Sequence, residues 1–276
     1  MNDTFSRNLA RLRKERKFTQ EKLAEALGVS FQAVSKWETA QSYPDIELLP
    51  HLARLLITDI DSLLGFMPTR RSTTKYEEYY KQGGFYWGVA PNQMCYEVMR
   101  LKPPTTPLRL LDICCGEGKD AVFFANNGYI VSAFDIAEAG IDKGRKLADL
   151  NGAEVNFFTA DVLDFIPECE FDIIYTSGGL LYFSPPRRRE MIGEYKKKTA
   201  PGGINAMNTF AEKPFIPRAP DSEDSEHYWT SGELFSYYHD WYFHTCTELV
   251  FDCDSSGTPH KHCMNVLIAE KMRGDK

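Results

Sequence analysis

The chain has 276 residues, long for a single domain, and 43% of them are hydrophobic, which is enough for two cores. The formal net charge is −7, yet residues 1–40 hold eight Lys and Arg against five Asp and Glu. A basic head in an acidic chain favours a nucleic-acid contact confined to the head.

The seven cysteines show no C-x-x-C spacing, which disfavours a disulfide framework and favours a reducing compartment. The sequence has no apolar run of membrane length and no signal-like first segment. We therefore expect a cytoplasmic protein without a membrane contact.

Residues 5–65 have the pattern of short helices joined by tight turns. Thr19 and Ser30 are good N-caps, and each stands before a run with helical period. Gly28 is the residue type that ends a helix in a left-handed conformation. A further apolar run from Ile46 to Leu56 predicts more helix, so the region as a whole predicts an all-α helix-turn-helix domain.

This region resembles the repressor-like, XRE-type family of helix-turn-helix domains. T-Q-x-x-L-A-x-x-L-G-V-S and the later V-S-K-W-E are almost unbroken between Thr19 and Glu38. The resemblance implies binding to double-stranded DNA, as a homodimer whose half-sites lie about 10 base pairs apart or a multiple of that. It also implies that Gln20 contacts a phosphate, and that the residues facing the major groove are Ser30, Phe31, Gln32 and Lys36. The alternative is a protein-interaction module that has lost DNA binding.

Residues 67–74, with Pro68 among Thr, Ser and Arg, predict a linker. It would separate a DNA-binding domain, residues 1–66, from a second domain, residues 75–276. Aromatic residues surround three glycines from Tyr76 to Gly88. They suit either a lid that stacks on a ligand or a helix packed on a sheet.

The stretch from Leu108 to Ala125 passes from an apolar strand through a glycine turn into a helical pattern. This unit predicts a nucleotide-like cofactor above the carboxyl end of the strand. Gly116 and Gly118 fit a loose dinucleotide pattern, which alone is weak. Asp112 decides between cofactors, because its carboxylate would repel a pyrophosphate but attract the amine of S-adenosylmethionine.

At Asp112–Gly118 the sequence resembles the acid-x-G-x-G-x-G motif of class I S-adenosylmethionine-dependent methyltransferases. Cys114 replaces the first glycine, and because it carries a Cβ we expect its backbone to avoid positive φ and to narrow the approach to the ligand. The resemblance implies an enzyme with S-adenosyl-L-methionine as cofactor. The expected cofactor-binding residues are Asp112, Cys114, Gly116, Gly118, Asp135, Ile136, Asp161, Val162, Ser177 and Trp87.

Acids also follow the next two predicted strands. Asp135 ends a strand over 129–135 and can take both ribose hydroxyls, or alternatively can cap the next helix. The methyltransferase resemblance implies that Asp161 takes the adenine amino group and that Val162 lines the ring. Three acids at one edge of a sheet favour a binding site there.

Strands alternate with helices four times, which predicts a doubly wound, Rossmann-like α/β sheet. Pro201-Gly202-Gly203 predicts a turn before a fifth strand over 204–210, and the basic runs 187–189 and 196–198 predict a solvated helix face. A helix carrying residues 237–241 is expected next.

Two successive strands, 242–251 and 263–271, should then finish the sheet as a C-terminal antiparallel hairpin. This ending is a trait of methyltransferases and not of dehydrogenases.

Residues 75–271 resemble, more narrowly, the tellurite-resistance methyltransferases of the TehB type. The resemblance rests on Tyr-Trp-Gly at 86–88, Gly-Glu-Gly-Lys-Asp at 116–120 and Gly-Glu-Leu-x-x-Tyr-Tyr-x-x-Trp at 232–241. It implies methyl transfer to a small acceptor such as tellurite or selenite. The alternative is a transcription regulator whose methyltransferase-like domain only senses S-adenosylmethionine or another small ligand.

An oxyanion acceptor needs cations or hydrogen-bond donors, and the catalytic candidates are His260, Lys261 and His262. On a strand the two histidines face one way while Lys261 and Cys263 face the other, so at most one pair should point at the ligand. A hydrated hairpin turn is the alternative. Cys253, His260, His262 and Cys263 together have the right ligand types for a metal site. Methyl transfer needs no metal, however, and we expect none.

Overall fold

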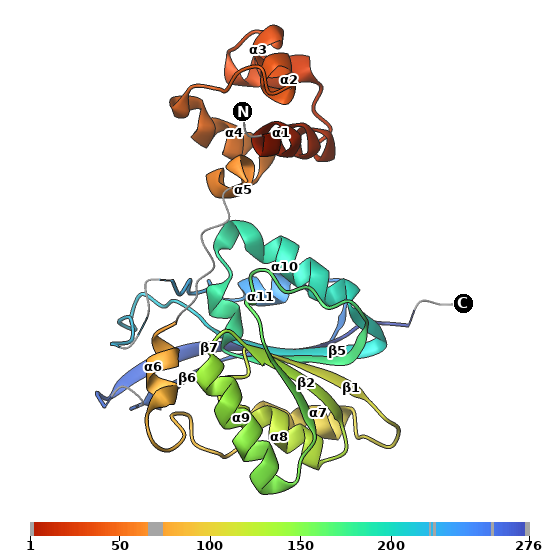
Figure 1. Ribbon diagram of the computed structural model, residues 1–276, viewed down its shortest axis with the longest axis vertical. Coiled ribbons are helices and arrows are strands. Elements are labelled where there is room, and N and C mark those ends of the chain that lie inside the picture. Colours follow the sequence, from red (N-terminus) through yellow and green to blue (C-terminus); the bar gives the residue numbers. More distant parts are fainter. Residues whose placement is uncertain (1–2, 66–73, 221, 223–224, 255–256, 274–276) are drawn as a thin grey trace. The chain divides into compact units, whose positions relative to one another are not determined.

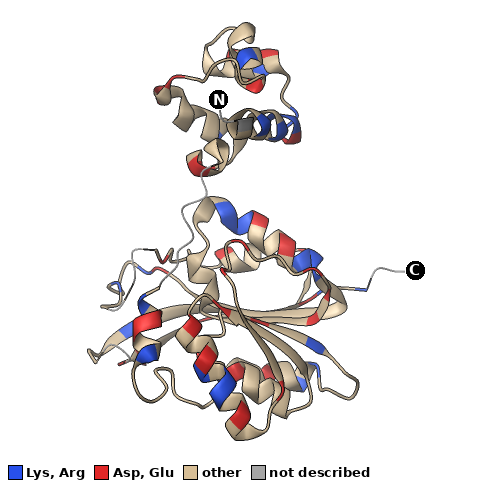
Figure 2. Cartoon of the chain, in the orientation of Figure 1, with Lys and Arg blue, Asp and Glu red and all other residues tan. Residues whose placement is uncertain are grey.

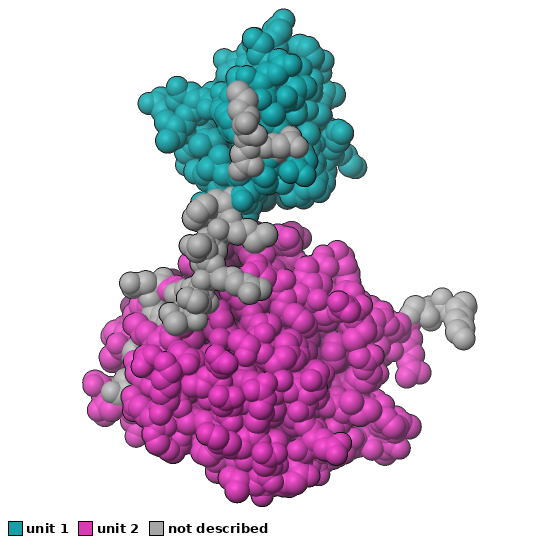
Figure 3. Space-filling view, in the orientation of Figure 1, with its two compact units in different colours: residues 1–70 teal, residues 71–276 magenta. Residues whose placement is uncertain are grey.

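The computed structural model describes residues 3–65, 74–220, 222, 225–254 and 257–273 (Figure 1). The chain divides into two compact units, residues 1–70 and 71–276 (Figure 3). Of the predicted linker, only Thr74 lies within the described residues. Among the described helices, none has the length and apolar character needed to cross a membrane.

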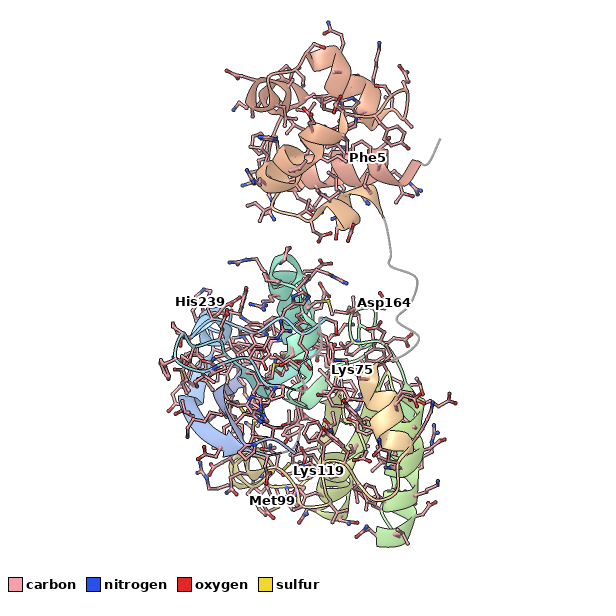
Figure 4. The ribbon with its side chains drawn as sticks, turned by 90° about the vertical axis from the view of Figure 1, so that its left-hand side faces the viewer. Phe5, Lys75, Met99, Lys119, Asp164 and His239 are labelled. Atoms are coloured by element: carbon pink, nitrogen blue, oxygen red, sulfur yellow. The ribbon has the colours of Figure 1, made fainter. Side chains whose placement is uncertain are left out.

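The first unit is a set of short helices around one apolar core. Thr19 and Ser30 cap the second and third helices by accepting hydrogen bonds from backbone N–H groups, and Gly28 ends the second at φ 67°, as predicted. Phe5, labelled in Figure 4, is one of the buried core residues. The elements are α1 (Asp3–Glu15), α2 (Gln20–Leu27), α3 (Phe31–Glu38), the 3-10 helix η1 (Ile46–Leu48), α4 (Leu49–Leu56) and α5 (Ile60–Leu64).

The second unit is a seven-stranded sheet in the order β3-β2-β1-β4-β5-β7-β6. The first five strands are parallel, and β7 runs antiparallel between β5 and β6. This confirms the doubly wound α/β fold that ends in an antiparallel hairpin. The strands are β1 (Arg109–Ile113), β2 (Ile130–Asp135), β3 (Val155–Thr159), β4 (Phe171–Ser177), β5 (Thr199–Phe210), β6 (Tyr242–Cys253) and β7 (His260–Glu270).

Helices cover both faces of this sheet (Figure 1). One face carries α7 (Gln93–Leu101), α8 (Lys119–Asn126) and α9 (Glu138–Asn151), and the other carries α10 (Pro185–Lys197) and α11 (Glu233–Ser236). The order reverses between β1 and β4, which is where ligands of open α/β sheets bind. Helix α6 (Lys75–Lys81) and the 3-10 helix η2 (Gly179–Tyr182) complete the described helices.

Several boundaries in the second unit differ from those predicted. The expected turn at Pro201-Gly202-Gly203 lies inside β5, because Gly202 and Gly203 exchange backbone hydrogen bonds with Lys271. The expected helix over 237–241 is a series of turns, since α11 ends at Ser236. Strand β7 begins at His260 rather than Cys263, because its pairing with β6 extends to that residue.

Candidate functional site

The turn after β1 holds three residues in the left-handed region: Cys114 (φ 55°), Gly116 (φ 55°) and Gly118 (φ 78°). The expectation that Cys114 avoids positive φ is therefore wrong. A non-glycine residue in this region costs about 1–3 kcal/mol unless packing holds it. Packing does so here: a Cβ added at Gly179 would come within 2.7 Å of the Cys114 Cβ. The absence of a side chain at Gly179 makes room for that of Cys114.

The two glycines of this turn are required by close contacts. A Cβ on Gly118 would lie 2.7 Å from the Phe157 ring and 2.9 Å from the Gly144 backbone, so no side chain fits. A Cβ on Gly116 would lie 2.9 Å from the hydroxyl of Tyr80. The turn therefore forms a cradle of bare backbone where α8 begins.

Asp112 is the next-to-last residue of β1 and carries an unsatisfied oxygen. Its Oδ2 is buried without a hydrogen-bond partner among the described residues. Burial, reinforced by the charge of Asp120, raises the pKa of Asp112 well above its ordinary value, although the Ala121 N–H opposes the shift. A cationic amine at Oδ2 would supply the missing donor and favour the ionised form. This oxygen and the cradle fit S-adenosylmethionine, whose amino acid end carries such an amine.

Asp135 joins the ends of β1 and β2. Its Oδ2 accepts from the Gly116 N–H at 2.8 Å and its Oδ1 from the Ala137 N–H at 2.9 Å. Burial raises the pKa of Asp135, and these N–H groups lower it in part. The bond to Ala137 closes a turn before α9, whose N-cap residue is Ala137 and which has no side-chain cap bond, so the alternative that Asp135 caps this helix is not borne out. A carboxylate offers about four acceptor positions, so its predicted bonds to ribose stay open.

The other predicted cofactor residues lie along the same edge of the sheet. Asp161 follows β3 and accepts from the Leu163 N–H, and Val162 is buried in the core. Ile136 is half-buried and directly follows Asp135. Ser177 ends β4, where its hydroxyl accepts from Asn92 and from Asn208 at 3.1 Å each.

The aromatic segment packs onto the glycine cradle. It forms helix α6, which lies against α9, so of the two alternatives the packed helix describes residues 75–81. The hydroxyl of the buried Tyr80 accepts from the Trp87 indole N–H at 2.9 Å, and the Trp87 backbone N–H donates to Glu117. Burial, followed by the charge of Asp135, raises the pKa of Tyr80 well above its ordinary value.

Several polar residues behind the cradle were not predicted. Asp120 accepts from the Asn92 N–H and from the Tyr175 hydroxyl, each at 2.8 Å, and the buried Glu117 pairs with Lys143 at 2.8 Å. Both acids lie in the cradle motif, one before and one after Lys119, which Figure 4 labels at the start of α8. Their acidity was the available signal, but their partners come from distant elements.

A cavity of about 260 Å³ lies at the end of β5 and the start of β7. Its lining includes three cations and two acids: Lys213, Arg218, Lys261, Glu212 and Glu226. Two of these cations pair with acids outside this set, Lys213 with Glu248 and Lys261 with Asp252, so the lining carries no clear excess of positive charge. Among the catalytic candidates, Lys261 and His262 line it, whereas His260 does not.

The faces of β7 alternate as predicted, since the Nε2 atoms of His260 and His262 lie 2.9 Å apart. Lys261 instead pairs with Asp252 at 2.6 Å. Lys261, His262 and Cys263 all line the cavity, and the expectation that at most one pair points at the ligand stays a prediction. The cavity reaches both faces where β7 begins.

The prediction of a solvated basic face on α10 fails at Arg188. This guanidinium is 2% exposed, pairs with Glu233 at 2.7 Å and lies 4.3 Å from the centre of the Trp229 ring. It also donates to the backbone carbonyls of His227 and Tyr228, which line the cavity. Arg188 therefore fixes the chain segment that forms one wall of the cavity.

In the first unit, all four residues expected in the major groove are exposed: Ser30, Phe31, Gln32 and Lys36. Figure 2 shows basic residues concentrated on α1. The Gln20 amide donates to Glu38 at 2.6 Å, and Glu38 also pairs with Arg13. Gln20 thus has a structural role, and its phosphate contact stays a prediction.

Comparisons with known proteins place both units. Residues 9–63 match the family described as helix-turn-helix, and residues 110–203 match the family described as methyltransferase domain. The chain is 43% identical over 60 residues to the HTH-type transcriptional activator BcrR of Enterococcus faecalis, covering 22% of this chain and 29% of that protein.

A second similarity is to the uncharacterized methyltransferase sll0829 of Synechocystis sp., at 31% identity over 99 residues, 36% of this chain and 45% of that protein. The chain therefore spans less than half the length of these two relatives. The solved structure of TehB from Haemophilus influenzae matches with a TM-score of 0.59 at 21% identity, over 71% of this chain and 67% of that one, which shows the fold. The chain thus joins an XRE-type helix-turn-helix domain to a class I S-adenosylmethionine-dependent methyltransferase domain.

Proposed function

We propose that the second domain, residues 75–276, transfers a methyl group from S-adenosylmethionine to a small acceptor. The observation that carries the proposal is the orphaned Oδ2 of Asp112 beside the bare backbone of Gly116 and Gly118. An ammonium group is the kind of ligand that satisfies such an oxygen. We also propose that residues 1–66 bind DNA.

S-adenosylmethionine supplies an electrophilic methyl group for an in-line displacement. The leaving group needs no proton, so the chain's own residues have to orient the reactants and exclude water. Asp112 and Asp135 would hold the two polar ends of the cofactor, and Asp161 and Val162 would meet the adenine. Trp87 and Tyr80 close this site on the side of α6.

For the acceptor we propose a small anion of the tellurite or selenite type, held in the cavity at the end of β5. The proposal is supported by the Lys213, Arg218 and Lys261 side chains of its lining, which are groups that can hold an anion. Lys261 and His262 would orient it from β7, with His260 packed behind His262. The TehB-like fold agrees with this choice.

Turnover tests the proposal. Methyl transfer from labelled S-adenosylmethionine should be measured with tellurite, selenite, arsenite and a panel of thiols. We expect a methylated product with at least one oxyanion and reduced turnover in Lys261→Ala or His262→Ala. Cofactor binding without product on any acceptor would instead support a regulator that senses S-adenosylmethionine.

Calorimetry tests the cofactor site separately. Asp135→Ala should weaken S-adenosylmethionine binding by about 1.5–3 kcal/mol, the scale for hydrogen bonds to a charged group. Asp149→Ala is the matched control, because Asp149 is exposed on α9. Equal affinity of the two variants for S-adenosylmethionine would show that Asp135 does not bind the cofactor. Tight binding of NAD by the wild type would contradict the assignment of S-adenosylmethionine as cofactor.

The DNA-binding proposal predicts that affinity resides in the first unit and falls steeply with salt. Gln32→Ala should lose preference for a selected sequence while keeping affinity for random DNA. Gln20→Ala should weaken binding to both DNAs alike. Because the loss of Gln20 also removes a hydrogen bond to Glu38, binding is measured at a temperature where circular dichroism shows that the variant is folded. Equal losses of affinity in both variants on both DNAs would contradict the predicted position of the recognition helix.

A further inference from the structure

We infer that Cys253, His260 and His262 form a binding site for a divalent cation of the zinc type. The Sγ atom and the ring nitrogens of these residues lie within 4.8 Å of one another. Among the described residues, these three side chains form a cluster of potential metal ligands. They lie at the turn end of the β6–β7 hairpin, where Cys253 ends β6 and His260 begins β7.

The hairpin holds these side chains in register. Cys253 pairs directly with His260 across the two strands, and His262 lies two residues further along on the same face. The His262 ring is buried and stacks on Phe210 of β5, with ring centres 4.3 Å apart. Paired strands therefore place the three ligand atoms together, as a metal site requires.

The hydrogen bonding of His260 suits a metal ligand. Its Nδ1 lies 2.7 Å from the Thr258 carbonyl oxygen, so this nitrogen carries the proton and donates it. That bond fixes the tautomer with a lone pair on Nε2, the atom facing His262. A backbone carbonyl behind a histidine is the usual outer support of a metal site.

The spacing of the ring nitrogens needs only a small adjustment. The two Nε2 atoms are 2.9 Å apart, and one of them must donate to the other. Two nitrogens bound tetrahedrally at about 2.0–2.1 Å from zinc lie about 3.3 Å apart. Moving the two Nε2 atoms a few tenths of an ångström further apart, and shifting the His262 proton from Nε2 to Nδ1, would direct both Nε2 lone pairs at the cation.

The ligand types select the cation. A thiolate with two imidazoles suits zinc and similar borderline-soft ions, whereas calcium and magnesium prefer oxygen ligands. Three protein ligands leave a fourth position for water or a donor atom of a bound molecule. Because His262 also lines the 260 Å³ cavity, that molecule would have access from the cavity.

The experiment uses the full chain after treatment with a chelator and dialysis. Titration with Co²⁺ should give the absorption of thiolate-bound tetrahedral cobalt at one equivalent per chain, and Zn²⁺ should displace it. Bound Zn²⁺ should also raise the thermal midpoint, since it binds only the folded hairpin. Both readouts are independent of methyl transfer.

Variants separate this site from adventitious binding. Cys253→Ser should abolish the thiolate band, and His260→Ala should weaken zinc binding at least tenfold. Cys246→Ser and His239→Ala are matched controls on exposed residues and should leave titration unchanged. Circular dichroism checks that each variant is folded. No uptake of Co²⁺ or Zn²⁺ by the folded wild type, or equal uptake by folded Cys253→Ser, would overturn the inference.

Discussion

The two sides of the ligand edge of the sheet are built in different ways. On the cofactor side, the ends of β1 and β2 are joined by a bond from Gly116 to Asp135, which lie 19 positions apart in the chain. On the acceptor side, Arg188 reaches Glu233 across 45 positions. The proposed cofactor side is centred on one local motif that distant residues such as Gly179 and Tyr175 support, whereas the proposed acceptor side is joined by one buried cation. The acceptor side should therefore lose more from the replacement of a single residue.

The largest effect should come from Arg188→Met. Removing one partner of a buried ion pair costs about 3–5 kcal/mol of unfolding free energy, because the remaining polar groups lose their partner. The segment carrying His227 and Tyr228 would also be released, so the KM for the acceptor should rise while cofactor affinity holds.

Denaturant unfolding measures the loss of stability, steady-state kinetics measure the acceptor KM, and calorimetry measures the cofactor affinity. Arg189→Met is the matched control, since this exposed neighbour lies 5.9 Å from the centre of the Tyr237 ring and its loss should cost about 1 kcal/mol or less. Similar losses for both arginines would mean that the acceptor side does not depend on the buried cation.

The second test breaks the cofactor side. Gly118→Ala should cost about 2–4 kcal/mol, because the residue has positive φ and the new Cβ would meet the Gly144 backbone. Gly193→Ala, inside α10 with open space around it, should instead stabilise the chain by up to about 1 kcal/mol. Opposite signs in thermal melts would confirm the cradle, and equal signs would contradict it.

The third test uses the raised pKa of Asp112. A carboxyl group with a raised pKa in the folded state favours folding below its unfolded pKa, and this contribution is lost as pH rises through the raised value. Asp112→Asn should therefore make the cofactor-free chain more stable toward neutral and alkaline pH. The same change should weaken the binding of S-adenosylmethionine by about 1.5–3 kcal/mol.

Thermal melts over a pH series, with and without cofactor, measure both effects. Asp149→Asn serves as the exposed control. A variant that loses stability without cofactor at every pH would show that Asp112 is satisfied inside the protein.

Local patterns predicted most of the fold. The caps Thr19 and Ser30 gave the bounds of α2 and α3, because the capping bonds span only three residues. The sequence also predicted that Asp112, Asp135 and Asp161 share one edge of the sheet, since parallel strands bring their carboxyl ends together. Arg188 could not be recognised, because a run of three arginines does not show which one faces inward.

The conformation of Cys114 was predicted wrongly for a similar reason. Its positive φ depends on Gly179, which lies after β4 and has no pattern linking it to the motif. The binding roles of Asp161 and Lys261 stay predictions.

Helix α6 lies at the start of the second unit and places Tyr80 against the glycine cradle. It is 7 residues long, its cap Thr74 is the first described residue after the junction, and its Tyr80 hydroxyl faces Gly116. The first described helix of the second unit therefore also contributes a side chain to the glycine cradle. Tilting or unwinding α6 would move the Tyr80 hydroxyl away from Gly116.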